Sequence, residues 1–323
     1  TLYGPTVNPR DPEVSPGGSS GGEGAALAAG FTPLGLGNDA GGSVRLPALF
    51  AGVVSLKPTP GRFPSDRSAG PRDLTLASQL IPVDGVLAVS VEDLELVYPL
   101  LSGPDLRDPR ALPVPLGGPR PHRIRVAVTL DPGHTGVDPV VAAAVRRAAE
   151  VLAAAGYDVV EADPPRFAEV VADYGALVHT EFGLRRDLLY RLIGDHGRRY
   201  LDLASTLATT VDFPGYVGLT ARRMGLQRDW GAWLADHPLV LGPVFSDVGT
   251  APDQDIASLE DHRRIGQALA LCSATSYLGL PAVSVPVGLA GRRPLGVQLI
   301  GPSFREDLCL EAAGVLEAAL GRI

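Results

Sequence analysis

The sequence predicts a layered α/β fold, because apolar runs of strand length alternate with amphipathic stretches of helix length. The clearest sign is a strand–helix–strand unit between residues 124 and 161. A hydrophobic fraction of 45% and a charged fraction of 20% are ordinary for a globular protein. The 323 residues can bury a sizeable core, and they contain neither an internal repeat nor a second independent core.

Residues 1 to about 68 are rich in Gly, Ser and Pro, but specific residues interrupt the glycine clusters, so this segment is not low-complexity sequence. Ser20 and Glu23 have the spacing of a capping box, which predicts a helix that starts at Ser20 and runs to Gly30. The next expected elements are a buried strand at 31–36, a tight turn at 37–42 and a second helix from about Ser43, with Pro47 in its first turns.

In the strand–helix–strand unit, we expect strands at 124–129 and 157–161. The helix between them spans 139–155, with Asp138 as its N-cap and Gly156 at its end. The other expected elements are a loop at 66–82, a helix at 91–101, a linker at 103–121, mainly helices over 167–236 with a break near 213–215, a strand at 239–245, a helix at 259–271, strands at 282–286 and 296–300, and a helix at 306–320.

Charge and composition argue against several classes of function. The net charge of −8 offers no general attraction to nucleic acid or to an anionic membrane. No apolar run approaches the 18 residues that a membrane span needs, and there is no signal peptide, so we expect a cytoplasmic protein. Cys272 and Cys309 have neither metal-ligand spacing nor a disulfide framework, which predicts two buried thiols. Thr1 is not expected to be a natural translation start.

Two glycine-rich segments contain serines, at residues 15–23 and 37–45. A phosphate cradle is one reading, but a Walker loop needs a lysine that neither segment has. Glycines that merely close tight turns are a second reading, which does not account for serines inside both turns. The third reading is nucleophilic catalysis: Ser43 follows two glycines, and the backbone N–H groups around it can form an oxyanion hole.

The two segments resemble the amidase signature family, whose core reads Gly-Gly-Ser-Ser-Gly-Gly followed by Gly-Thr-Asp-x-Gly-Gly-Ser-x-Arg-x-Pro. Similar motifs continue along the chain at residues 56–62, 85–93, 279–282, 294–302 and 306–307, and the resemblance is weakest from 165 to 250. It implies an α/β/α sandwich around a mixed β-sheet, forming one domain over residues 1–323 whose N-terminal part is missing. Within it, residues 165–236 would be a helical insertion over the substrate cleft.

The resemblance also implies a Ser–Ser–Lys triad that hydrolyses a carboxamide to an acid and ammonia or an amine. Ser43 would be the nucleophile and Ser19 the bridging serine, placed after a cis peptide bond at Gly18. The implied supporting residues and oxyanion donors are Ser20, Asp39 and Arg45 for support, and the N–H groups of Ala40, Gly41, Gly42 and Ser43 as donors. Neither a metal nor a cofactor is required.

The family's lysine base lies upstream of the double-serine motif and has no counterpart in this chain. The single lysine, Lys57, matches a different family segment, for which a structural or surface role is expected. This chain would then be a truncated and inactive form of an amidase. The alternatives are the glutaminase-type subunit of a tRNA-dependent amidotransferase and a catalytically inactive remnant.

Two positions depart from the family pattern. Asn38 replaces the usual Thr, and Ser276 stands where the family has Asn. The expected partner is a small-molecule amide, with no nucleic acid and no membrane, and a homodimer is left open. The aromatic candidates for the pocket walls are Tyr174, His179, Phe182, Trp230 and Trp233, although aromatics at helical spacing usually belong to a core.

Overall fold

A mixed eight-stranded sheet forms the centre of the protein in the computed structural model, which describes residues 4–69 and 72–323. The strand order is β1-β5-β2-β9-β10-β8-β6-β7. Their bounds are β1 Leu34–Asp39, β2 Val54–Lys57, β5 Val83–Ala88, β6 Arg125–Val128, β7 Asp158–Glu161, β8 Leu239–Pro243, β9 Ala282–Ala290 and β10 Arg293–Ile300. Strand β6 runs parallel to β7 and β8, whereas the other pairs are antiparallel.

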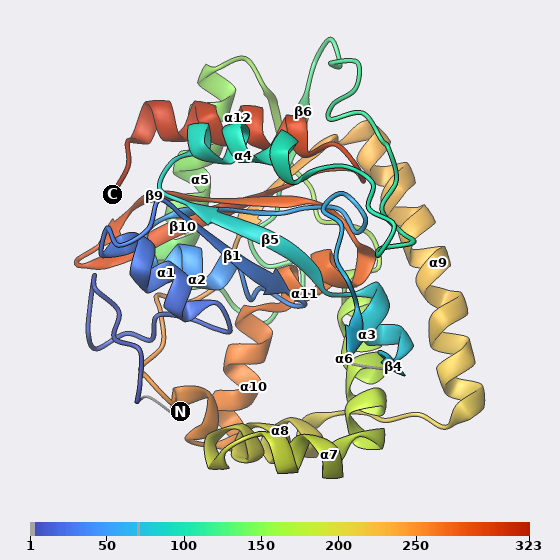
Figure 1. Cartoon of the computed structure of the whole chain (residues 1–323). Coiled ribbons are helices and arrows are strands. Elements are labelled where there is room, and N and C mark those ends of the chain that lie inside the picture. Colours follow the sequence, from blue (N-terminus) through green and yellow to red (C-terminus); the bar gives the residue numbers. More distant parts are fainter. Residues whose placement is uncertain (1–3, 70–71) are drawn as a thin grey trace.

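Helices cover both faces of this sheet, as Figure 1 shows for α4 and α12 on one side and α1, α2 and α11 on the other. The first face packs against α4 (Val91–Leu101), α5 (Pro139–Ala154) and α12 (Glu306–Leu320) in one apolar cluster. Apolar side chains from both layers, such as Val126 on β6 and Leu316 on α12, are fully buried in it. The layered α/β/α architecture is thereby confirmed.

The opposite face carries α1 (Gly21–Ala28) and α2 (Arg45–Ala51), which pack on β5 through Leu27, Ala48 and Leu87. Beside them, α11 (Ala270–Leu278) packs on the sheet and on the helical region. That region contains α6 (Phe167–Leu184), α7 (Arg186–Leu192), α8 (Asp195–Leu207) and α9 (Phe213–Asp236). After α9 and strand β8 come a short 3₁₀ turn, η1 (Gln254–Ile256), and α10 (Leu259–Ala268). Figure 1 shows α7 and α8 at the end of the molecule farthest from the sheet.

Several boundaries predicted from the sequence are confirmed. Helices α4 and α12 have the predicted bounds, α5 ends one residue early, and the linker at 103–121 has no helix or strand. The first strand was predicted at 31–36 but lies at 34–39, where its residues pair with β5. The break in the helical region precedes residue 213, because Phe213 begins α9 with Asp212 as its N-cap.

Two strands of the sheet, β2 and β5, were not predicted. Strand β2 has only four residues and is buried along its whole length between β5 and β9, so it lacks the alternation that marks a half-exposed strand. The predicted loop at 66–82 contains the hairpin β3 (Ser68–Ala69) and β4 (Arg72–Asp73) and the helix α3 (Leu76–Leu80). Residues 70 and 71 of that loop, like Thr1, lie outside the described residues.

The prediction of a capping box at the start of α1 is wrong, because the expected side-chain hydrogen bond does not form. Ser20 does precede the helix, but its hydroxyl makes no capping hydrogen bond. It faces Gly37 instead: a Cβ added to Gly37 would lie 2.3 Å from Ser20 Oγ. The double-serine loop is therefore packed against β1.

Within the described residues, no helix combines the length and the apolar character that crossing a membrane requires.

Gly85 tests the close packing of the central strands. A Cβ at this position would lie 2.6 Å from the backbone oxygen of Leu56. The backbone of β2 or of β5 would have to move to make room for it, which would disturb the pairing of the two strands. We expect Gly85→Ala to lower the free energy of unfolding by about 1–3 kcal/mol, measured by chemical denaturation.

The matched control for this substitution is Gly231→Ala on α9. A Cβ there meets no atom within 4 Å, and alanine favours the helix. Equal stability of the two variants would contradict the packing at Gly85.

Candidate active site

The turn between β1 and α2 is organised around the carboxylate of Asp39, the last residue of β1. Its oxygens accept hydrogen bonds from the backbone N of Gly42 at 2.8 Å and of Val44 at 3.1 Å. They also accept from Arg45 Nε at 3.0 Å and Nη2 at 2.9 Å. One buried carboxylate therefore fixes both the path of the turn and the first residue of the next helix.

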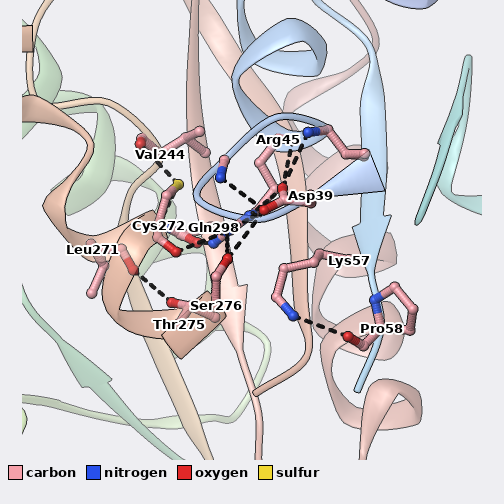
Figure 2. Close-up of polar contacts among 12 residues, drawn as sticks. Asp39, Arg45, Lys57, Pro58, Val244, Leu271, Cys272, Thr275, Ser276 and Gln298 are labelled. Atoms are coloured by element: carbon pink, nitrogen blue, oxygen red, sulfur yellow. Dashed lines mark hydrogen bonds and ion pairs between the residues drawn. The ribbon is translucent and has the colours of Figure 1, made fainter. Parts of the chain in front are cut away.

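Arg45 ties this turn to the rest of the molecule. Its guanidinium donates to Gln298 Oε1 on β10 at 2.8 Å and, on α11, to the backbone oxygen of Cys272 and to Ser276 Oγ, both at 2.9 Å. Figure 2 shows these contacts converging on the Asp39–Arg45 pair. The turn is thus held between the sheet and α11 through a side chain that is fully buried. We call Asp39, Arg45, Ser276 and Gln298 the clamp.

Charge pairing within the clamp decides the ionisation of Asp39. Burial by itself would raise the pKa of this carboxyl, but the Arg45 guanidinium holds it well below its usual range. Burial likewise works to lower the pKa of Arg45, and Asp39 outweighs that effect and raises it. Both groups therefore stay charged, and each neutralises the other inside the protein.

Ser43 lies on the partly exposed side of the turn. Ala40, Gly41 and Ser43 are each partly exposed, whereas Asp39 and Val44 are buried. The clamp is thus beneath the turn, and the partly exposed residues present a hydroxyl and backbone N–H groups above it.

The loop that carries Ser19 contacts this turn. The backbone N of Ser20 donates to the backbone oxygen of Ser43 at 3.1 Å. The peptide bond Gly18–Ser19 is cis, at the position where the family resemblance implies one, and Ser19 is exposed. The structure thus brings the two serine segments together through their backbones. In the described part of the chain, no hydrogen bond joins the hydroxyls of Ser19 and Ser43.

The N–H of Gly42, one of the four predicted oxyanion donors, is directed to Asp39 Oδ1. It supports the turn in this structure, which leaves the N–H groups of Ala40, Gly41 and Ser43 as the candidate donors.

Lys57 is fully buried at the end of β2, so the surface role considered for it is wrong. Its Nζ donates to the backbone oxygen of Pro58 at 3.0 Å, and Figure 2 shows this contact. Burial, reinforced by the nearby charge of Arg45, lowers the pKa of Lys57 from 10.5 to about 7.

Two clamp residues were not predicted as part of the site. Gln298 was noted only as part of a family motif, yet a lone amide in an apolar strand is a signal that a buried partner is needed. Ser276 was noted only as a departure from the family, and it also donates to Asp39 Oδ1 at 3.2 Å. The other departure, Asn38, donates to Asp84 Oδ1 across the β1–β5 pair at 2.7 Å.

The aromatic side chains of the helical region divide into two groups. Trp230 is fully buried in the core between α9 and the sheet, so it is not a pocket wall. Trp233 packs beside it and stacks on His237 at a centroid distance of 4.6 Å. Tyr174, His179 and Phe182 on α6 are partly exposed.

Comparisons with known proteins identify the family to which the sequence is similar. The sequence model of the family described as "Amidase" matches residues 1–310. An indoleacetamide hydrolase of Bradyrhizobium diazoefficiens is 36% identical over 323 residues, which cover 99% of this chain and 62% of that protein. The glutamyl-tRNA(Gln) amidotransferase of a Synechococcus species has a subunit that is 34% identical over 355 residues, covering 99% of this chain and 70% of that protein.

The fold matches solved structures of the same kind. A 6-aminohexanoate cyclic dimer hydrolase complexed with substrate superposes with a TM-score of 0.80 and 29% identity, over 98% of this chain and 71% of that one. The chain therefore spans 62% to 71% of the length of these three proteins.

Arg45→Met tests the clamp. It leaves the buried Asp39 carboxylate without its counter-charge, so we expect the free energy of unfolding to fall by about 3–5 kcal/mol in chemical denaturation. The control is Arg107→Met, which breaks an exposed pair of the same length with Asp105 and is expected to cause no measurable change. A comparable loss in both variants would contradict the clamp.

Lys57→Met tests the burial of the lysine. Because its pKa is lower in the folded than in the unfolded state, the unfolded chain binds more protons between pH 7 and 10.5, and stability rises with pH in that window. Methionine removes this dependence. As the pH is raised from about 7.5 to about 9.5, we expect the free energy of unfolding of the native protein to increase by about 2–3 kcal/mol more than that of the variant. A difference that is independent of pH would refute the lowered pKa.

Proposed function

Because the chain belongs to the amidase family, we propose that it supplies the serine machinery that hydrolyses a carboxamide to a carboxylic acid and ammonia or an amine. The observation that carries this proposal is the clamp: a buried ion pair fixes a Gly-Gly-Ser turn with Ser43 partly exposed and in contact with the Ser19 loop. Such a turn offers both a hydroxyl and N–H donors to a carbonyl group.

In the proposed reaction, Ser43 Oγ attacks the amide carbon while its proton passes by way of Ser19 Oγ to a base. The N–H groups of Ala40, Gly41 and Ser43 would stabilise the negative oxygen of the tetrahedral intermediate. The C–N bond then breaks, and the leaving nitrogen takes up the proton. Water attacks the resulting acyl-enzyme ester, which releases the acid and restores the Ser43 hydroxyl.

A serine hydroxyl needs an adjacent base, and Lys57 is not placed to act as one. Its amine points to the Pro58 carbonyl at the end of β2, and no contact connects it with Ser19 in the described residues. We propose that the base comes from outside residues 1–323, and that these residues alone turn over little or no substrate.

The relatives indicate two substrate classes. The first is an arylacetamide, because one relative is an indoleacetamide hydrolase. The second is glutamine, because another relative belongs to an amidotransferase, which would make this chain the ammonia-supplying part of a complex. We favour the arylacetamide because that relative has the higher identity, 36% against 34%.

The test measures ammonia release from indole-3-acetamide and from glutamine by the natural gene product that contains these residues. We expect turnover of the arylacetamide, and we expect Ser43→Ala to lower kcat by about 10⁴-fold or more because the nucleophile is lost. The control is Ser303→Ala, which removes an exposed hydroxyl from the loop after β10 and should leave kcat unchanged.

Undiminished turnover in Ser43→Ala would refute the nucleophile. A preference for glutamine, together with co-purification of a second protein chain, would favour the amidotransferase role. Loss of activity in Lys57→Met without loss of folding would contradict a base from outside these residues.

A further inference from the structure

The side chain of Tyr174 on α6 contacts the turn that carries Ser43. Gly41 has no side chain, and a Cβ built on it would lie 2.4 Å from Tyr174 Oη and 3.3 Å from Tyr174 Cζ. Because a carbon–carbon bond is about 1.5 Å long, the phenol oxygen lies within about 4 Å of the Gly41 Cα. The hydroxyl of Tyr174 is therefore next to the middle of the proposed nucleophile turn.

Packing on both sides of Tyr174 fixes its position. Its ring is in edge contact with the ring of Tyr277 on α11, with centroids 6.5 Å apart at 84°, and Tyr277 is fully buried. The preceding residue, Asp173, accepts two hydrogen bonds from Arg222 on α9, at 2.7 and 2.8 Å. Tyr174 and Ala40 of the turn also pack against the same apolar cluster. Helix α6 thus holds the phenol at the turn.

The hydroxyl of Tyr174 remains protonated at neutral pH. Burial raises the pKa of this phenol, because a phenolate would lose its hydration. The side chain is nevertheless partly exposed, as are Gly41 and Ser43. Tyr174 therefore presents a neutral O–H group, which can donate a hydrogen bond, on the side of the turn that is only partly covered.

The N–H of Gly41, a candidate oxyanion donor, lies close to this hydroxyl. The backbone N is one bond from the Gly41 Cα, so it is no more than about 5.5 Å from Tyr174 Oη. An N–H···O bond spans about 2.9 Å and an O–H···O bond about 2.7 Å between heavy atoms. One acceptor oxygen can therefore lie within hydrogen-bond distance of both donors.

Resting on the proposed function, we propose that Tyr174 is a further catalytic residue, whose hydroxyl donates a hydrogen bond to the carbonyl oxygen of the amide next to the N–H of Gly41. This oxygen becomes negative in the tetrahedral intermediate, so the bond strengthens as Ser43 attacks. Tyr174 keeps its proton throughout. A side-chain donor is useful here because the N–H of Gly42 is directed to Asp39 and does not face the substrate.

Two substitutions separate this role from simple packing of the hydroxyl on Gly41. Tyr174→Phe removes the hydroxyl and retains the ring contact with Tyr277. Gly41→Ala displaces the hydroxyl, since the backbone of Gly41 lies outside the left-handed region and the new Cβ meets Tyr174 Oη first. If the hydroxyl donates to the substrate, both changes remove the same hydrogen bond. If it only fills space, Tyr174→Phe is harmless and relieves the clash in Gly41→Ala.

The experiment measures kcat and KM for ammonia release from indole-3-acetamide and from glutamine by the natural gene product that contains these residues. We expect Tyr174→Phe to lower kcat about 10²-fold and to change KM less than about threefold. Gly41→Ala should cause a similar loss, and the double variant should lose no more than about threefold beyond either single variant. The matched control is Tyr157→Phe, whose hydroxyl contacts Glu311 on the opposite face of the sheet and whose loss should leave kcat unchanged.

An unchanged kcat in Tyr174→Phe, or recovery of the Gly41→Ala activity when Tyr174→Phe is added, would overturn the role of Tyr174 and leave the proposed function intact. Absence of turnover in the unaltered protein would refute the proposed function and this role with it. Urea midpoints of all variants, expected to be the same for Tyr174→Phe and the unaltered protein, separate a loss of kcat from a loss of folding.

Discussion

The buried pair of Asp39 and Arg45 is the interaction on which the rest of the site depends. Asp39 is the last residue of β1, and its two carboxylate oxygens accept hydrogen bonds from the backbone of the turn and from the guanidinium of Arg45. Arg45 begins the next helix and reaches both β10 and α11. Two buried charges are tolerated only while each is paired with the other. The turn therefore cannot rearrange without leaving one of the two charges buried and unpaired.

This constraint explains why the proposed nucleophile can be partly exposed and still fixed. The turn above the clamp is only partly buried, at Ala40, Gly41 and Ser43. Its shape comes from hydrogen bonds below it, which leave its upper side to face α6 and α11. The helical region then supplies side chains around the turn, while the sheet supplies rigidity.

Local signals in the sequence predicted the helices that have a clear capping residue or a clear amphipathic pattern. The helix at 139–154 has an aspartate cap and a following glycine, and the helix at 306–320 is amphipathic, so both were predicted closely. Strand β2 was missed because it is buried on both faces and shows no alternation. The Ser20 cap was mispredicted because its hydroxyl packs against Gly37, a residue from another element. Tertiary contact overrode local preference there.

The sequence by itself determined the layered α/β class, the family resemblance and the serines that would carry the chemistry, because these depend on residue order and on short motifs. Only the tertiary structure decided that Gln298 and Ser276 complete the clamp and that Lys57 is buried with a lowered pKa. These residues are far apart along the chain. Their proximity follows from strand order and helix packing, which no local pattern encodes.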